Sequence, residues 1–333
     1  MLLWEIDRSL TELTNAYGFE RASRAYRASL NAVTGLKSLV LQSGIACDMR
    51  DKDSLYLAAG GTSAELFEEH QLRLRAGLPG DFLDHAGLLD RFGIARAGAI
   101  VSPGAADADP MQLARGLLRL SVGRGARLFE GEAVAFDSAA RSVGIQLGKG
   151  HEIEARSVIL ATGYVMPDIV HSTVHTVSSS WAIATPPQPQ HIWKDAALIW
   201  ENSKDYLYAR STRAGRIIIG GEDSECDIEP EARDRLIPEK SRKLAHKLAA
   251  LWPIANTEIE FRWAGTFDTT SDGLPLIGPV PDNKGVYAAY GYGGNGITFS
   301  FMAAQLIGDL IAGSTSPLLR DFALDRDGAS GAC

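Results

Sequence analysis

The chain has 333 residues, of which 45% are hydrophobic and 22% are charged. This balance is typical of a globular protein with one large domain or two smaller ones. The formal net charge is −8, from 33 basic and 41 acidic residues, which argues against nucleic acid or an anionic membrane as a partner.

The cysteines and the apolar stretches exclude further classes. The three cysteines are widely separated: Cys47, Cys226 and Cys333. They form no C-x-x-C motif, so neither a disulfide framework nor a zinc site is indicated. The apolar start at residues 1–4 ends at Glu5, which is too short for a signal peptide. We therefore expect a cytoplasmic protein without a membrane span.

The first half of the chain alternates helices and strands. Apolar residues at helical spacing predict helical structure over 9–42. A strand at 54–58 and a charged helix at 65–75 follow. Asp109 is the expected N-cap of a helix that continues through 119, with Pro110 at its first position. Four short strands come next: 126–130, 133–137, 142–147 and 157–161.

The second half is richer in strands. We expect a strand at 174–185, and then a hairpin of strands 205–211 and 216–221. Gly221, Glu222 and Asp223 are predicted to form a polar turn after the hairpin, followed by one or two helices over 230–252. The last elements are a strand at 286–290, a glycine loop and a helix at 297–312.

The glycine loop is the sharpest local motif. Residues 291–296 read G-Y-G-G-N-G and so satisfy G-x-G-x-x-G between a strand and a helix. A dinucleotide-binding βαβ unit also needs a second parallel strand that ends in an acidic residue, and only about twenty residues follow this helix. The motif is therefore weak support for a nicotinamide-dependent dehydrogenase, although its glycines would let the main chain approach a ligand closely.

Three segments in order carry a resemblance: residues 262–265 (R-W-A-G), 272–279 (D-G-L-P-L-I-G-P) and 291–298 (G-Y-G-G-N-G-I-T). Together they resemble the C-terminal signature of the D-amino-acid oxidase, glycine oxidase and sarcosine oxidase family of FAD-dependent oxidoreductases. The resemblance implies that the last segment passes the pyrimidine side of the isoalloxazine ring, where the N-terminus of a helix would stabilise a reduced flavin. The cofactor-binding residues implied there are Gly293, Gly294, Asn295, Gly296, Ile297 and Thr298.

Two weaker segments agree with this resemblance. The helix from Asp109 and the following stretch to Val134 are similar to the family's helix and strand whose valine contacts adenine. The strand at 157–161 and its turn resemble the strand beneath the cofactor, which implies contacts from Ala161, Thr162 and Gly163. No cysteine falls in these motifs, so we expect FAD to be bound noncovalently.

The main departure from the family lies at the start. Residues 3–7 (L-W-E-I-D) resemble a segment that, in relatives, follows the first βαβ unit with its G-x-G-x-x-G turn. Such a unit takes about 30 residues and does not precede this segment here. Without it the pyrophosphate loses its helix N-terminus, and the sheet loses a central parallel strand. We hypothesise that Met1 is an internal start.

The resemblance implies a mixed α/β fold in which an N-terminally incomplete, Rossmann-like FAD-binding domain is interleaved with an antiparallel-sheet substrate domain. The FAD-binding segments would be 1–45, 98–165 and 262–325, and the substrate-binding segments 46–97 and 166–261. The implied reaction is oxidation of the C–N bond of an amine or amino acid by hydride transfer to FAD, which oxygen or another acceptor then reoxidises.

One substitution bears on the substrate. Relatives that oxidise α-amino acids hold the substrate carboxylate with an arginine shortly after W-A-G, and Phe267 stands there in this chain, which disfavours a simple α-amino acid. In the strand at 205–211, alternation places Tyr206, Tyr208 and Arg210 on one face. Two aromatic rings beside a guanidinium could bind a carboxylate-bearing amine. Alternatively, Arg210 is paired with a surface carboxylate.

Two other interpretations remain open. The chain could be a truncated, flavin-free remnant that acts as a non-catalytic binding protein, which would purify colourless. His171 and His175 stand four residues apart and could form one edge of a metal site on a helix, but the stretch looks extended and no third ligand is near in sequence. We therefore assign no metal ligands.

Overall fold

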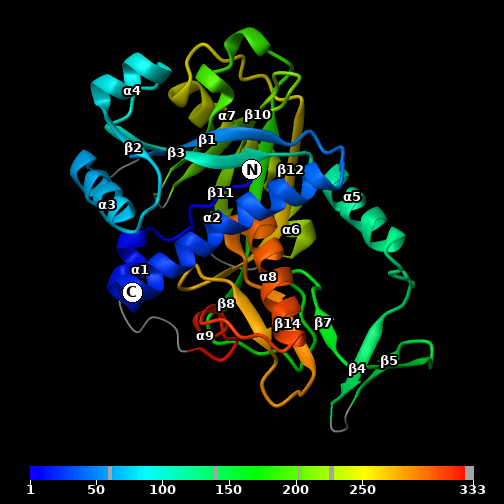
Figure 1. The fold of residues 1–333 in the computed structure, drawn as a ribbon. Helices are drawn as coiled ribbons and strands as arrows, with labels where there is room; N and C mark the ends of the chain where they lie inside the picture. Colours follow the sequence, from blue (N-terminus) through cyan, green and yellow to red (C-terminus); the bar gives the residue numbers. More distant parts are fainter. Residues whose placement is uncertain (59–61, 139–141, 202, 204, 225–228, 327–333) are drawn as a thin grey trace.

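A computed structural model of the protein describes residues 1–58, 62–138, 142–201, 203, 205–224 and 229–326. The fold combines one large sheet, two small sheets and helices that pack on them, with α2 (Phe19–Gln42) crossing in front of the large sheet (Figure 1). The predicted mixed α/β fold class is confirmed.

The large sheet has eight strands in the order β12-β8-β11-β10-β9-β1-β3-β2. Its neighbouring strands are antiparallel except for β1 and β9, which are parallel. Its strands are β1 (Arg50–Leu57), β2 (Asp81–Asp84), β3 (Gly98–Asp107), β8 (His175–Ala184), β9 (Leu198–Glu201), β10 (Leu207–Ser211), β11 (Ile217–Ser224) and β12 (Phe261–Thr270). The predicted hairpin is β10 and β11, which pair in register from Leu207–Gly221 to Ser211–Ile217.

One face of the large sheet is covered by α7 (Ile237–Leu251), which follows the short α6 (Pro230–Arg235). The apolar stripe of α7, at Leu244, Leu248 and Leu251, is buried against strand residues such as Ile183 and Ile219. Strand residues alternate between the two faces of a sheet. Side chains on the other face of β10 therefore remain available for a cavity.

A second core lies around the N-terminal segment and the last long helix. Helix α8 (Gly296–Ile311) packs against α2, and their shared core includes Trp4, Tyr26 and Phe299. The small sheet beside it has the order β13-β14-β7 (Leu276–Pro279, Val286–Tyr290 and Val158–Leu160), with β14 antiparallel to β13 and parallel to β7. The glycine loop thus connects β14 to α8.

The remaining elements surround these layers. A separate three-stranded sheet, β4-β5-β6 (Ala133–Asp137, Val143–Leu147 and Glu152–Ala155), extends at the lower right of Figure 1. The other α-helices are α1 (Leu10–Tyr17), α3 (Ser63–Arg75), α4 (His85–Phe92), α5 (Pro110–Gly123) and α9 (Leu318–Asp321). As predicted, Asp109 caps α5 by accepting hydrogen bonds from the Met111 and Gln112 amides. Within the described residues, no helix combines the length and apolar character needed to cross a bilayer.

A buried charge network, formed by Glu5, Glu69 and Arg73, fixes the N-terminal segment. Arg73 on α3 is 1% exposed and donates to Glu69 at 2.7 Å, while its Nη1 lies 3.9 Å from Glu5. The other contacts of Glu69 are with the start of α1, where it accepts from the amides of Leu10 and Thr11. Buried charges are tolerated when they are paired in this way. The network therefore ties residues 5–11 to α3.

The helical region predicted over 9–42 consists of two helices, because Gly18 has φ +80° and ψ 155°, which no helix can continue through. Two other local predictions were wrong. The stretch 126–130 forms no strand. The predicted turn at 221–223 lies inside β11, since pairing with β8 extends that strand as far as Ser224.

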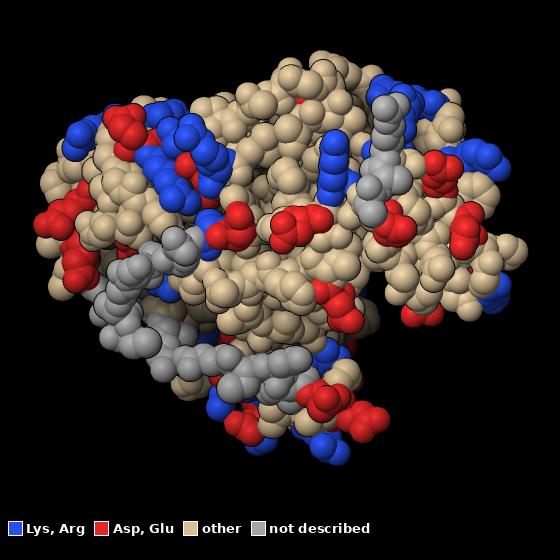
Figure 2. All heavy atoms as spheres, turned by 90° about the horizontal axis from the view of Figure 1, so that it is seen from below, with Lys and Arg blue, Asp and Glu red and all other residues tan. Residues whose placement is uncertain are grey.

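The surface carries both signs of charge. On the face shown in Figure 2, acidic and basic side chains are interspersed and no continuous basic band crosses it.

Candidate functional site

A cavity of about 580 Å³ lies between the large sheet and the glycine loop. Residues of strands β8, β9, β10, β11 and β12 line it, together with the N-terminal segment and residues 293–295. Its volume is within the range typical of small-molecule sites. Its aromatic residues are Trp181, Trp200, Tyr206, Tyr208, Trp263 and Phe267.

The structure brings Tyr206, Tyr208 and Arg210 together in this cavity. The two tyrosine rings lie 6.5 Å apart between centroids. Tyr208 pairs across the hairpin with Gly220, where a Cβ would come within 2.2 Å of the phenol oxygen. Only glycine on β11 therefore leaves room for the Tyr208 ring in this position.

Arg210 is the only arginine or lysine among the described residues that line the cavity. Burial lowers the pKa of Arg210, and nearby Asp107 partly offsets that effect. Within the described part of the chain, Asp107 forms its ion pair with Arg50 instead. The Arg210 guanidinium therefore remains available to a ligand, and the alternative of a surface ion pair is not what the structure shows.

Three carboxylates of the described residues also line the cavity: Asp7, Glu201 and Asp223. Glu201 forms an ion pair with Arg96 at 3.1 Å. Asp223 accepts a hydrogen bond from the Tyr206 hydroxyl through Oδ2. Burial raises the pKa of Asp223 and raises that of Tyr206 well above its usual value. Two of the three carboxylates are thus engaged by side chains.

Asp7 faces the glycine loop from the N-terminal segment. Its Oδ2 accepts a hydrogen bond from the Gly294 amide at 2.7 Å, and a Cβ on Gly293 would lie only 2.1 Å from that oxygen. The side chain is exposed and opens on the cavity. Desolvation of the carboxylate there raises the pKa of Asp7 to about 6, although the Gly294 amide favours the charged form.

The glycine loop is held from three directions. Gly291 and Gly293 have φ of +72° and +56°, so both adopt the left-handed conformation that glycine permits. Asp268 on β12 accepts from the Gly291 amide at 2.7 Å and the Tyr292 amide at 3.4 Å. Besides the Asp7 contact, the Asn295 side chain donates to the Glu5 carbonyl at 2.6 Å. These contacts fix the loop conformation.

The start of α8 has the donors that an electron-rich ring edge requires. No side chain caps this helix, so the first amides, at Gly296 and Ile297, are free of side-chain acceptors within the described chain. A Cβ at Gly296 would meet no heavy atom within 4 Å. Helix N-termini favour negative charge, so these residues fit the pyrimidine edge of a flavin. Thr298 differs, because its buried hydroxyl donates to the Leu3 carbonyl.

Gly293, Gly294 and Asn295 line the cavity, whereas the remaining predicted cofactor contacts are not among its described lining residues. Val134 is on β4 and is 55% exposed. Ala161, Thr162 and Gly163 follow the end of β7 and are exposed. A contact from these four residues to the adenine or the rest of FAD stays a prediction.

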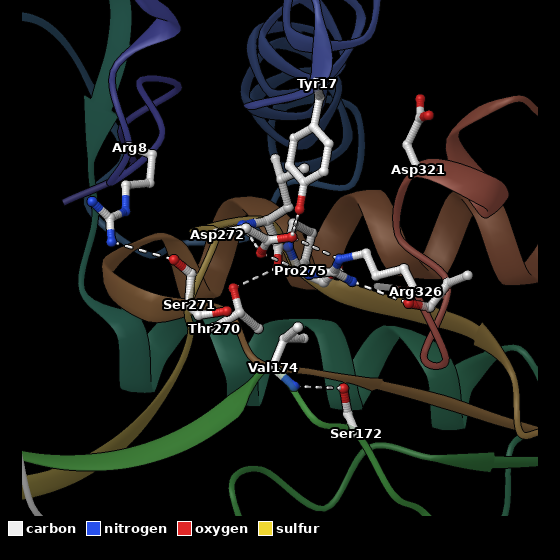
Figure 3. Close-up of polar contacts among 12 residues, drawn as sticks. Arg8, Tyr17, Ser172, Val174, Thr270, Ser271, Asp272, Pro275, Asp321 and Arg326 are labelled. Carbon is white, nitrogen blue, oxygen red and sulfur yellow. Dashed lines mark hydrogen bonds and ion pairs between the residues drawn. The ribbon is translucent and has the colours of Figure 1, made fainter. Parts of the chain in front are cut away.

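The D-G-L-P segment, residues 272–275, takes part in a hydrogen-bonded cluster outside the cavity. Asp272 accepts hydrogen bonds from the Tyr17 hydroxyl at 2.7 Å and from Arg326 at 2.8 and 2.9 Å (Figure 3). Arg326 also donates to the carbonyls of Leu274 and Pro275. This cluster joins α1, the turn after β12 and the C-terminal segment, and it does not line the cavity.

His175, considered above as a metal ligand, is on β8 and faces β12. Its Nε2 lies 3.5 Å from Asp268 Oδ2, and its ring packs edge-on against Tyr290. The Asp268 pKa is held below its usual value, against the effect of burial, by the nearby His175 imidazole and by hydrogen bonds from the two loop amides. Among the described residues, no group of three or more His, Cys, Asp or Glu is arranged to hold a metal ion.

Sequence reasoning missed Asp7, Asp223 and Asp268. Asp7 lies in the segment whose resemblance was noted, but its partner Gly294 is 287 residues away. Asp223 was assigned to a turn, which hid its place on a strand beside Tyr206. Asp268 follows Phe267 directly, and strand alternation would have placed it on the opposite face of β12.

Comparison with known proteins supports the resemblance. The model of the family described as "FAD dependent oxidoreductase" (DAO) matches residues 8–310. A putative Rieske 2Fe-2S iron-sulfur protein of Bacillus subtilis is 23% identical over 96% of this chain and 62% of its own length. The glycine oxidase of Geobacillus kaustophilus is 27% identical over 70% and 61%, and the D-amino acid dehydrogenase of Rhizobium johnstonii 26% identical over 98% and 80%. The chain thus spans about three fifths of the first two relatives.

Solved structures show the same fold. L-proline dehydrogenase from P. horikoshii has a TM-score of 0.80 at 16% identity, covering 97% of this chain and 85% of that one. Glycine oxidase from Geobacillus kaustophilus has a TM-score of 0.76 at 22% identity, covering 91% and 82%. The family model matches most of the sequence. The matched residues include the glycine loop at the start of α8 and most of the described residues that line the cavity. The chain belongs to the DAO family of FAD-dependent oxidoreductases, whose members are flavoproteins.

Proposed function

We propose that the complete protein oxidises the C–N bond of an amine or amino acid by hydride transfer to FAD. One observation carries this proposal. The cavity places the aromatic and basic face of β10 opposite the glycine loop, which is the part of the chain that fits a flavin edge. FAD supplies the hydride acceptor when it is bound, and the residues of the chain orient the amine and exclude water.

Arg210 is proposed to bind a carboxylate of the substrate. A desolvated guanidinium without a protein carboxylate partner can make a bidentate, charge-assisted contact of this kind. Tyr206 and Tyr208 would flank the bound molecule, with the Tyr206 hydroxyl oriented by Asp223. Phe267 and Trp263 provide apolar surface on β12. These features support an amine that carries a carboxylate and also has apolar bulk.

FAD is proposed to be noncovalent, and oxygen or another acceptor to reoxidise it. Within the described chain, Cys47 is buried in the core around α2, away from the cavity. Cys226 and Cys333 lie outside the described residues. Acid precipitation should therefore release the flavin into the supernatant, whereas yellow colour retained in the precipitate would contradict this assignment.

The division into an FAD-binding part (1–45, 98–165, 262–325) and a substrate-binding part (46–97, 166–261) also stays a proposal. The large sheet draws β3 and β12 from the first part and the other six strands from the second. The βαβ unit expected ahead of residue 3 and the cytoplasmic location likewise remain predictions. Sequencing the DNA upstream of the Met1 codon tests the former.

An absorption spectrum tests the function. The purified protein, and a form extended upstream, should take up FAD, turn yellow and bleach anaerobically when the correct amine is added. A panel of secondary amines and amino acids, with and without a carboxylate, identifies that amine. The flavin-free remnant, which the family match does not favour, predicts that both forms remain colourless with excess FAD.

A further inference from the structure

We propose that Asp7 is a catalytic residue that accepts the proton of the substrate ammonium group before the C–N bond is oxidised. The inference rests on the proposed function, since it assigns a step to the same cavity. Neither the family match nor the relatives assign this residue a role.

The reaction needs a proton acceptor. An aliphatic amine with a pKa near that of lysine, about 10, is protonated at neutral pH. The nitrogen lone pair must be free when hydride leaves the neighbouring carbon, because that pair forms the new C=N bond. A group in the cavity that removes this proton would therefore increase the reactive fraction of bound substrate.

Asp7 is the carboxylate left open for this task. Of the three carboxylates that line the cavity, Glu201 is paired with Arg96, and Asp223 accepts the Tyr206 hydroxyl. Asp7 has only the Gly294 amide on Oδ2, so its Oδ1 is free of hydrogen bonds from the described residues. No histidine or lysine is among the described lining residues.

The charged groups around Asp7 keep it a usable base. Arg8, its neighbour in sequence, pairs with Glu12 at 3.1 Å and favours the Asp7 anion only weakly, whereas Asp223 opposes it. Desolvation in the cavity has the largest effect and brings the Asp7 pKa to about 6. A base with a pKa just below the working pH is deprotonated and still basic enough to take a proton.

The position suits the chemistry as well. Asp7 contacts the loop of Gly293 and Gly294, the part of the cavity wall that fits a flavin edge, so it lies close to where the reacting C–N bond must be. Arg210 lines the same cavity from β10 and can hold the carboxylate of the same molecule. The substrate would thus span the cavity with its nitrogen toward Asp7.

The proton transfer is balanced. The Asp7 carboxylate and the substrate ammonium become a carboxylic acid and a neutral amine. FAD, when bound, would supply the acceptor for the hydride of the α-carbon, and the freed nitrogen lone pair would form the new C=N bond. Asp7 returns its proton to solvent before the next cycle.

The first test uses FAD-loaded protein and the pH dependence of kcat/KM for an amine that bleaches it. The wild type should show an acid limb with a midpoint near 6, the value for Asp7. Asp7→Asn should lose this limb and lower kcat/KM at neutral pH by about 100-fold, in line with the loss of a general base. Asp7→Glu should restore the limb and part of the rate.

The matched control is Asp81→Asn, an exposed aspartate on β2 outside the cavity, which should leave the profile unchanged. If Asp7→Asn retains the acid limb and stays within twofold of the wild-type kcat/KM, the inference is wrong. Bleaching by amines would still stand in that case, so the proposed function fails or succeeds separately.

A second test needs neither FAD nor turnover. In protein labelled with ¹³C at aspartate carboxyl carbons, the signal missing from Asp7→Asn reports the titration of Asp7. Saturation with trimethylglycine, a fixed cation with a carboxylate, should lower the Asp7 midpoint by about one unit or more, because a nearby opposite charge favours the anion. An unchanged midpoint would mean that the cation end binds elsewhere, and would overturn the assignment.

Discussion

Arg210 is the residue whose chemistry is most directly testable. Arg210→Gln should raise KM for a carboxylate-bearing amine by roughly 10- to 100-fold, because a charge-assisted hydrogen bond contributes about 1.5–3 kcal/mol. The same change should have little effect on an amine without a carboxylate. Steady-state kinetics with such a substrate pair measures the difference. Arg213→Gln is a matched control, since Arg213 follows on the same hairpin but is 74% exposed. Equal losses for both substrates would contradict a carboxylate-binding role.

Asp7 should also affect stability in a pH-dependent way. Its pKa is raised from 3.8 to about 6 in the folded protein, so the folded state binds a proton more tightly than the unfolded state does. Stability should therefore fall as pH rises from about 4 through 6. Asp7→Asn removes this loss, and denaturant titrations should show the variant more stable than the wild type at pH 8 but not at pH 4. An equal stability difference at both pH values would refute the assignment.

The sequence predicted side-chain groupings that follow from local periodicity. Tyr206, Tyr208 and Arg210 share a face because they alternate along one strand, and the structure places all three in the cavity. Asp7 and Asp268 could not be found in this way. They accept hydrogen bonds from backbone amides 287 and 23 residues away. Partners this far along the chain leave no pattern in the sequence around the carboxylate.

At the scale of elements, the glycine loop depends on Asp268 of β12. Asp268→Asn keeps one carbonyl acceptor but points an NH2 group at the second loop amide, which would lose its hydrogen bond. We expect FAD affinity to fall about tenfold, from the loss of one such bond near 1–1.5 kcal/mol. Flavin fluorescence titration measures the dissociation constant. Asp282→Asn, exposed in the loop between β13 and β14, serves as control. Unchanged FAD binding in Asp268→Asn would show that the loop does not need this contact.

Elements with strong periodicity were predicted well, and those set by tertiary pairing were not. The hairpin of β10 and β11, the strand β8 and the helix α8 lie within a few residues of their predicted bounds. Residues 9–42 have an uninterrupted helical pattern, yet the conformation of Gly18 divides them. The continuation of β11 through Ser224 depends on β8, a partner about 40 residues earlier in the chain that local turn propensity does not reveal.

At the scale of the whole molecule, the Asp272 cluster links both ends of the chain. Arg326→Met should destabilise the fold by about 3–5 kcal/mol, because it leaves the buried Asp272 without its charge partner. Thermal unfolding measures the effect. The double variant Asp272→Asn/Arg326→Met should recover part of the loss, since neither buried charge remains. A single variant as stable as the wild type would show that the cluster contributes little.

The family was predictable because three of its motifs occur in order over residues 262–298. The mixed fold then followed from the family. The arrangement of the large sheet was not, since β9 and β12 were not identified as strands and the parallel pairing of β1 with β9 joins segments about 140 residues apart. The position of the cavity between this sheet and the glycine loop follows only from these long-range pairings.

The buried pairing of Arg73 with Glu69 has a consequence for local opening. Glu69 holds the first amides of α1, and Arg73 approaches Glu5, just before Asp7. Detaching the N-terminal segment would leave these buried charges without partners in an apolar interior. The segment and α3 should therefore unfold as one cooperative unit. Native-state hydrogen exchange should then show that Leu10 and Thr11 and the amides of α3 share one opening free energy. Separate exchange of the two would mean that the wall carrying Asp7 can detach on its own, and with it one side of the cavity.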